Sequence, residues 1–381
     1  MPETLTADPA APDLDAVLAR LRTEPAPSAR TVWHTLAASG TVGALYDDPA
    51  PDTRWGLDPR RLRTVLTALD TAFPLGTTLS FCVQAATALP LLRDAPPDSP
   101  AGHTAAQALA GHATLALAVT DTAAAGSDLT AMDTRIEQEG GTLVLTGGKR
   151  WIVNATTADH ALVLARRRPG DHFSHFCLLL VPLTAPGVRA EPADTLWFDG
   201  AGIGSLHFDG VRLPADHLIG SPSRGLAAFA RRISTERLAS GLWADALTSR
   251  VLTRTHRALT RRRIAGAPQW DNAAVRQEFA AALIDQQRLR ALCDTVCAPA
   301  PDGPPPAVAA ALLKAAGADT LERVLTLCAR LQGAEAFERG GLHQLRTEAA
   351  MFGIAGGTGH TLRDVVADHT EVLLDARRTA S

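Results

Sequence analysis

The spacing of apolar residues changes twice along this 381-residue chain, and these changes constrain its fold more than any single motif. From Asp13 to about Ala113, apolar residues recur with the period of amphipathic helices. Near Leu115 the period falls to two, and short apolar runs between Gly, Asp, Asn and Pro turns continue to about Gly220. Long helical patterns return from Ser221 onward. The sequence therefore predicts an α+β protein whose sheet is antiparallel.

Three domains follow from this pattern: an N-terminal helical domain over 13–114, a central β domain over 115–220 and a C-terminal helical domain over 221–381. In the last domain, a Pro-rich loop at 298–306 separates two long helical stretches. Helices with one apolar face need partners, so this region most simply packs as a four-helix bundle.

Composition narrows the range of partners and compartments. The net charge of −3 gives no reason to expect a nucleic acid or an anionic membrane as a partner. Five scattered cysteines argue against a disulfide framework and suit a reducing cytoplasm, where we expect the protein to reside. The acidic, Pro-rich N-terminus and the lack of a long uninterrupted apolar run predict neither a signal peptide nor a membrane span.

Two further features of the composition concern possible ligands. No His, Asp and Glu set stands at metal-ligand spacing, so we expect no metal site. Lys149 and Lys314 are the only lysines, and we attribute this Arg-heavy usage to coding bias.

Five motifs occur in a fixed order along the chain: VTDTAAAGSD at 119–128, GKRWIVN at 148–154, LHFDGVRLP at 206–214, ISTERL at 233–238 and IAGGT at 354–358. In this order and spacing they resemble acyl-CoA dehydrogenases, over about residues 15–375. The resemblance implies the acyl-CoA dehydrogenase fold, a bound FAD and assembly as a homodimer or homotetramer.

The resemblance also implies the residues that contact FAD. Thr120, Ser127, Trp151 and Val153 would line the cofactor. Small residues in the first motif let the backbone approach a flat ring or a diphosphate, and Trp151 offers an aromatic wall. Val153 stands where the family commonly has Thr, so a hydroxyl group is missing there.

Three other positions in the C-terminal domain resemble cofactor contacts. Arg261 matches an arginine that reaches across a subunit interface to the FAD diphosphate, and a guanidinium suits phosphate. Gln332 lies in a Gly-containing turn that resembles one touching the neighbour's FAD, and Thr358 belongs to the C-terminal loop motif.

The resemblance places the catalytic base at an unusual position in this sequence. Most acyl-CoA dehydrogenases have a Glu in the C-terminal loop where this chain has Gly356, which cannot remove a proton. A minority, including isovaleryl-CoA and long-chain enzymes, supply the base from the first bundle helix, in a segment similar to Thr235-Glu236-Arg237. The resemblance therefore implies Glu236 as the base, with Arg237 and Ser127 near the substrate. The alternative is that Glu236 forms an ordinary ion pair along its helix.

The function implied by this resemblance is flavin-dependent α,β-desaturation of an acyl thioester. The acyl group would be carried by CoA or, in a biosynthetic pathway, by a carrier protein. An electron-transfer flavoprotein or dioxygen would reoxidise the flavin. Two alternatives stay open: a flavin-dependent monooxygenase on the same fold, and a noncatalytic flavin-binding subunit.

Overall fold

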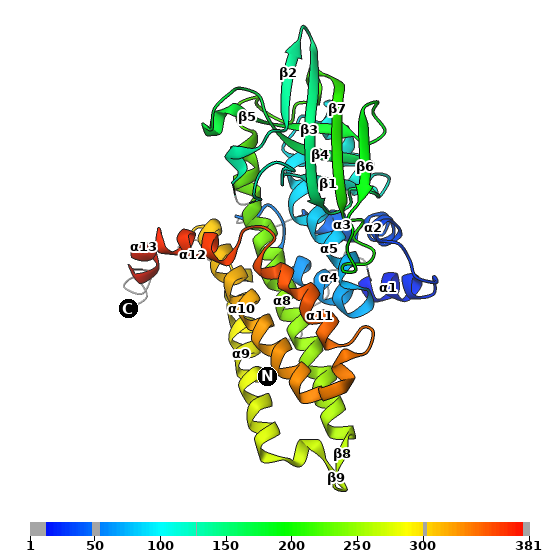
Figure 1. Ribbon diagram of the computed structural model, residues 1–381, viewed down its shortest axis with the longest axis vertical. Helices are drawn as coiled ribbons and strands as arrows, with labels where there is room; N and C mark the ends of the chain where they lie inside the picture. The colour runs from blue at the N-terminus through cyan, green and yellow to red at the C-terminus, as the bar shows by residue number, and fades with distance from the viewer. Residues whose placement is uncertain (1–12, 48–53, 127, 300–302, 376–381) are drawn as a thin grey trace. The chain divides into compact units, whose positions relative to one another are not determined.

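The computed structural model describes residues 13–47, 54–126, 128–299 and 303–375, which form two compact units (Figure 1). Unit 1 comprises the described residues of 1–61 and 74–232, and unit 2 those of 62–73 and 233–381. Along the chain, helices are followed by a sheet and then by helices, as the sequence predicts. Unit 1 holds most of the N-terminal helices together with the sheet, and unit 2 holds the bundle.

The N-terminal helices follow the apolar periodicity of the sequence. They are α1 Leu14–Arg22, α2 Ala29–Ala38, α3 Thr41–Ala44, α4 Pro59–Ala72, α5 Leu75–Val83, η1 Gln84–Ala88, α6 Leu89–Arg93 and α7 Pro100–Leu109. Asp13 and Ser28 cap α1 and α2, since each side chain accepts a hydrogen bond from a backbone N–H in the first turn. The run Leu75–Arg93 is long and apolar enough to cross a membrane, but 94% of its most apolar window is buried, as in a core helix.

The sheet of unit 1 is mixed rather than purely antiparallel. Its strands are β1 Leu115–Ala118, β2 Arg135–Glu139, β3 Thr142–Ile152, β4 His160–Arg166, β5 Phe176–Pro182, β6 Val188–Pro192 and β7 Gly204–Pro214. Strands β2, β3, β7 and β6 pair antiparallel in that order, as do β4 and β5, whereas β4 runs parallel to β1 and β2. The parallel pairs arise because the chain leaves β1, forms the β2–β3 hairpin and returns to β4 in the original direction.

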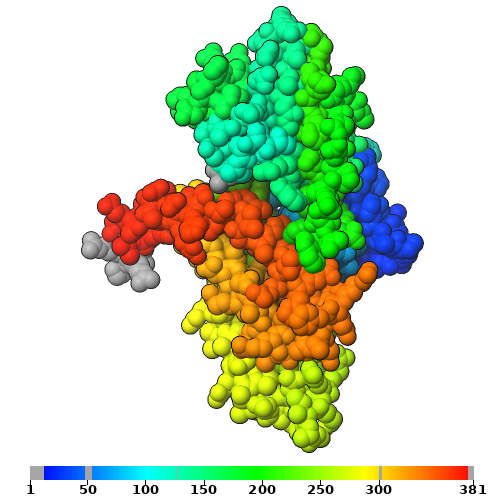
Figure 2. Space-filling view, viewed as in Figure 1, coloured from blue at the N-terminus to red at the C-terminus, as the bar shows by residue number. Residues whose placement is uncertain are grey.

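Unit 2 contains three long helices that run side by side (Figure 1). Its elements are α8 Gly225–Arg261, which begins in unit 1, β8 Arg263–Ile264, β9 Ala267–Pro268, η5 Gln269–Asp271, α9 Ala273–Cys297, α10 Pro306–Gln332, η6 Gly333–Phe337, α11 Leu342–Ala349, η7 Ala350–Gly353, α12 Gly359–Ala367 and α13 Thr370–Asp375, with most of α4. Helix α12 buries Leu362, and the side chains of α13 stay at least partly exposed, so both lie at the surface of unit 2 (Figure 2).

Two glycines let α8 and α10 approach each other closely. A Cβ on Gly241 would lie 2.4 Å from Leu313 Cγ, and one on Gly317 would lie 3.0 Å from Ala244 Cβ. Because close-packed interiors tolerate no such overlap, the two glycines set the spacing between these helices. This spacing places the first half of α8 beside the part of α10 that carries Lys314.

Candidate active site

The carboxylate of Glu236 lies against the loop that carries Gly356. A Cβ placed on Gly356 would lie 2.8 Å from Glu236 Oε1, a separation that real Cβ atoms essentially never show. Gly356 has φ +69° and Gly357 has φ +111°, conformations that residues with a side chain rarely adopt. Glu236 therefore occupies the space into which a side chain at position 356 would project. The structure thus brings together Gly356, where the usual base is missing, and Glu236, which the sequence analysis predicts as the base.

Two buried cations hold this loop by its backbone carbonyl groups. Arg237 Nε donates to the carbonyl oxygen of Gly356 at 2.9 Å. Lys314 Nζ donates to the carbonyl oxygens of Phe352 at 2.8 Å and Gly357 at 3.4 Å. Burial lowers the pKa of Arg237, although the charge of Glu236 opposes that shift. The loop is thus fixed on both sides of Gly356 by side chains from α8 and α10.

Sequence reasoning missed Lys314 as a part of this site. Its side chain is 1% exposed, and burial lowers its pKa to about 8, opposed by the charge of Glu236 and assisted by that of Arg237. The available signal was its rarity, because this chain keeps only two lysines among 37 basic residues. Both lysines prove to be buried, so coding bias alone does not account for where they stand.

Arg261 and Gln332 do not lie with Glu236 within one chain. Glu236 and Arg261 are 25 residues apart on α8, which corresponds to about 37 Å along a helix. Arg261 is exposed at the end of α8. The Gln332 amide is buried and donates to Thr255 Oγ1 at 2.9 Å, while Arg262 Nη1 donates to the Gln332 carbonyl oxygen at 2.9 Å. Gln332, Thr255 and Arg262 thus form a polar group near the C-terminal end of α8, remote from Glu236.

Thr358 ends the glycine loop and begins α12. Its Oγ1 accepts a long hydrogen bond from the backbone N–H of Thr361, at 3.5 Å, in the position of a helix cap. Thr358 therefore caps α12, in addition to its predicted contact with the cofactor.

In unit 1, Trp151 stands on a bulge of β3 and is 59% exposed. The register of β3 against β7 shifts between Lys149 and Ile152, and Trp151 has φ +58°. This strained backbone keeps the indole ring exposed although Lys149, two residues earlier, is fully buried. Val153 follows at a half-buried position, and the Thr120 carbonyl oxygen accepts from the backbone N–H of the residue before Trp151 at 3.0 Å. Three predicted flavin contacts are thus neighbours.

Ser127, the fourth predicted flavin contact, lies outside the residues that the structure describes.

A buried ion pair joins the loop after β1 to the strand that carries Trp151. Lys149 Nζ lies 3.3 Å from Asp121 Oδ2 and donates to the Val119 carbonyl oxygen at 3.0 Å. Asp121 Oδ2 also accepts from Thr134 Oγ1 at 2.6 Å. Burial would raise the pKa of Asp121, but the hydrogen bonds from Thr134 and the charge of Lys149 lower it. Burial lowers the pKa of Lys149 to about 8 despite the charge of Asp121.

Asp121→Asn is expected to lower the free energy of unfolding by about 3 kcal/mol at pH 7, because the Lys149 ammonium loses its buried counter-charge. Urea unfolding followed by circular dichroism measures this loss, and Asp209→Asn at an exposed position of β7 is the control. Because folding lowers the pKa of Asp121, its contribution is present above about pH 4 and is lost as the pH falls through the lowered value. Equal losses in the two variants would contradict a stabilising role.

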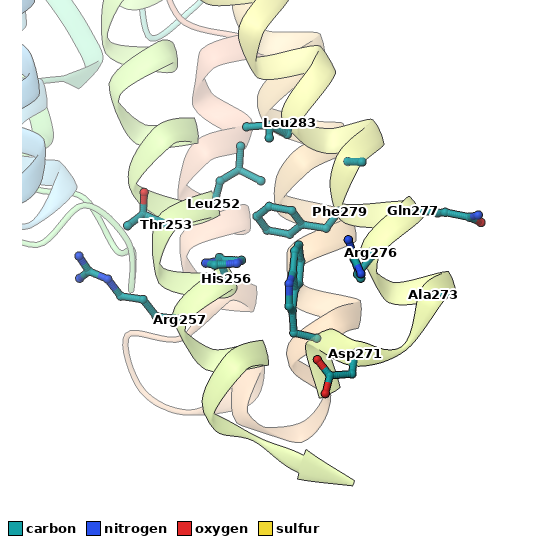
Figure 3. A pocket seen from close by; sticks show the side chains of 12 residues that line it. Leu252, Thr253, His256, Arg257, Asp271, Ala273, Arg276, Gln277, Phe279 and Leu283 are labelled. Atoms are coloured by element: carbon teal, nitrogen blue, oxygen red, sulfur yellow. The ribbon is translucent and has the colours of Figure 1, made fainter. Parts of the chain in front are cut away.

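A separate pocket of about 810 Å³ opens between α8 and α9 (Figure 3). Apolar side chains such as Leu252, Phe279 and Leu283 share its wall with polar and charged ones, among them Arg257, Asp271, Arg276 and Gln277. The ring of His256 meets that of Trp270 edge-on, with centroids 4.5 Å apart. Of the predicted site residues that the structure describes, none lines this pocket. The candidate active site is therefore defined by the Glu236 and Gly356 contact rather than by this hollow.

Within the described ranges, no group of three or more His, Cys, Asp or Glu side chains could hold a metal ion. The five cysteines are buried as free thiols.

Comparison with known proteins identifies the family of two parts of the chain. Residues 116–211 match the family described as acyl-CoA dehydrogenase, middle domain, and residues 223–370 match acyl-CoA dehydrogenase, C-terminal domain. An acyl-CoA dehydrogenase of Alternaria alternata is 33% identical over 100 residues, which span 26% of this chain and 23% of that protein. The acyl-(acyl-carrier-protein) dehydrogenase MbtN of Mycobacterium sp. (strain MCS) is 27% identical over 273 residues, 68% of this chain and 67% of that protein.

Among solved structures, butyryl-CoA dehydrogenase from Megasphaera elsdenii superposes with a TM-score of 0.81 at 17% identity, over 89% of each chain. This similarity shows the same fold. The class of protein is defined by two findings: the order of N-terminal helices, central sheet and bundle, and the two family domains that match in that order. The chain belongs to the acyl-CoA dehydrogenase family, whose members are FAD-dependent oxidoreductases.

Proposed function

We propose that this protein is a dehydrogenase that introduces an α,β double bond into an acyl thioester, with Glu236 as the base for the α-proton. The observation that carries the proposal is the position of the Glu236 carboxylate, 2.8 Å from where a side chain on Gly356 would begin. Most of the family places its base at that loop position. A carboxylate delivered there from α8 keeps the site of proton removal while its position in the sequence changes.

The described residues of unit 1 fit a flavin. Trp151 presents an indole face from a strained bulge, which suits stacking beside a flat ring system. Thr120 lies beside that strand, and the small residues that follow it leave the backbone accessible. FAD bound beside Trp151 and Thr120 would supply the acceptor for the hydride that leaves the β-carbon of the substrate.

The chain's own groups would handle the proton and the developing charge. Glu236 would take the α-proton, and the loop around Gly356 would offer a backbone N–H to the thioester carbonyl, where negative charge develops. Arg237 and Lys314 fix the carbonyl groups of this loop, so its backbone orientation is set before substrate binds. Arg237, a predicted substrate contact, would act on the substrate through the loop.

The acyl carrier and the partners are part of the same proposal. One relative is named for acyl-CoA and another for an acyl carrier protein, and we infer that this chain acts on one of these thioesters in the cytoplasm. An electron-transfer flavoprotein or dioxygen would reoxidise the flavin. Arg261 is exposed about 37 Å from Glu236 along α8, which supports a homodimer or homotetramer in which it serves a neighbouring subunit's cofactor.

Anaerobic titration of the purified flavoprotein tests the proposal. Acyl groups of increasing length, each as a CoA thioester and on a phosphopantetheinylated carrier protein, are added while the visible flavin absorbance is followed. One class of thioester is expected to bleach the flavin stoichiometrically and to yield the α,β-unsaturated product. Oxygen uptake by chemically reduced flavin without loss of the substrate's α-hydrogen would favour a monooxygenase instead. A flavin that no thioester bleaches would indicate a noncatalytic subunit.

A further inference from the structure

Lys314 is a buried cation whose hydrogen bonds all end on one loop. Its ammonium group donates to the carbonyl oxygens of Phe352 and Gly357, which bracket Gly356. The side chain is 1% exposed, so water does not screen its charge. An ammonium group carries three donors, and two are engaged by this loop. Burying a charged group costs free energy, so we expect the Lys314 ammonium to contribute more than packing.

The charge of Lys314 also acts on Glu236. Lys314 Cε lies 3.4 Å from the position of a Gly356 Cβ, and Glu236 Oε1 lies 2.8 Å from that same point. These two atoms are therefore separated by no more than the sum of the two distances. A positive charge near a buried carboxylate favours the ionised form of that carboxylate. The Lys314 ammonium is thus placed where its charge acts on Glu236.

Other charged groups around α10 act elsewhere. The charged groups that influence Lys314 are Glu236 and Arg237, both from α8. Helix α11 carries the buried Glu348, which is not among them. The ion pairs that link α10 to its other neighbours stand at least partly exposed at the surface: Asp285 with Arg323 and Glu278 with Arg330 toward α9, Glu322 with Arg346 toward α11 and Asp319 with Arg363 toward α12.

We propose that Lys314 is a positioning residue of the active site: it fixes the loop around Gly356 and holds the Glu236 carboxyl group ionised, ready to accept the α-proton. The inference rests on the proposed function, because it assigns Glu236 as the base. It adds a third group to the site, since the loop geometry and the charge state of the base both depend on one buried ammonium. Arg237 binds the Gly356 carbonyl oxygen but lies next to Glu236 on α8, whereas Lys314 approaches the same loop from α10.

This arrangement predicts two limbs in the pH dependence of flavin bleaching. The acid limb reports the ionisation of Glu236. The alkaline limb reports Lys314, whose pKa burial lowers to about 8 against the charge of Glu236. Lys314 is charged below that pH and neutral above it, so the hold on the loop weakens and the bleaching rate falls as the pH rises through about 8.

The test compares Lys314→Met with the parent by stopped-flow bleaching at saturating thioester between pH 5 and 10. Methionine is an unbranched side chain one heavy atom shorter than lysine, and it carries no charge. The acid limb is expected to move to higher pH, because the carboxylate loses a neighbouring positive charge, and the alkaline limb is expected to disappear. Lys314→Arg restores the charge in a larger group, so its acid limb should return to the parent value even if the rate stays low.

Controls separate this effect from lost stability. Leu325→Ala creates a cavity in the same helix, three turns from Lys314, and is expected to lower stability while leaving both limbs unchanged. If Lys314→Met does not fold, Lys314→Arg decides: an alkaline limb that persists near pH 8 in this variant, whose guanidinium stays charged, overturns the inference, as does the absence of an alkaline limb in the parent.

Glu236→Gln distinguishes failure of the inference from failure of the proposed base. Loss of bleaching in Glu236→Gln, together with an unmoved acid limb in Lys314→Met, refutes the role of Lys314 and leaves the base in place. Parent-like bleaching in Glu236→Gln refutes both.

Discussion

Glu236→Gln is expected to slow the bleaching of the flavin by an acyl thioester about 10³-fold, while FAD content and thioester affinity stay near those of the parent. The amide matches the carboxylate in shape but cannot accept a proton from a carbon acid. Position 356 offers no substitute, because glycine carries no side chain and its loop is held in a left-handed conformation. Stopped-flow absorbance under anaerobic conditions measures the rate directly.

The matched control is Glu322→Gln on α10, where the carboxylate is exposed and pairs with Arg346. Its bleaching rate is expected to equal that of the parent, because surface ion pairs contribute little. If both variants bleach the flavin at the parent's rate, another group removes the α-proton and the assignment of Glu236 is wrong.

Asp70→Ala is expected to lower the free energy of unfolding of unit 2 by about 3–5 kcal/mol. Asp70 is 1% exposed on α4, and its carboxylate accepts from Arg250 Nε at 2.7 Å and from Trp243 Nε1 at 3.0 Å. Removing the carboxylate leaves a guanidinium and a buried indole N–H without their acceptor. Chemical denaturation followed by circular dichroism measures the loss.

The effect of Asp70→Ala should extend to the loop around Gly356. The Trp243 ring packs against that of Phe352 with centroids 4.8 Å apart, and the Phe352 carbonyl oxygen accepts from Lys314. We therefore expect slower bleaching in this variant as well as lower stability. The control Asp319→Ala removes an exposed pair with Arg363 and should cost less than about 1 kcal/mol. Comparable losses in both variants would contradict the role of the buried pair.

The spacing of apolar residues predicted helices and strands correctly where one face of the element is buried. The helices α1, α8, α9 and α10 and the strands β1, β4 and β5 lie where periodicity places them. The strand β6 Val188–Pro192 was missed because most of its residues are exposed, which leaves no alternating apolar pattern. The parallel pairing of β4 also escaped, since pairing direction depends on the path of the chain between strands.

The candidate site was predicted in part. A glycine in the C-terminal loop and a glutamate 120 residues earlier suggested a relocated base, and both stand in one contact. Lys314 was missed because nothing near it in the sequence marks a site: it lies in an Ala- and Leu-rich helix. Its role follows from the two carbonyl groups that it meets, which belong to residues about 40 positions away.

Residue spacing along the chain thus determined the order of helices and sheet and the identity of the candidate base, because apolar periodicity and motif order are properties of neighbouring residues. The tertiary structure decided which groups lie beside this candidate base. The Gly241 and Gly317 contact sets how closely α8 and α10 pack, and that spacing brings a buried ammonium, a carboxylate and a glycine loop together. The proximity of these groups depends on distances between segments that are remote in sequence. Packing and electrostatic energies vary with distance in space, not with separation along the chain.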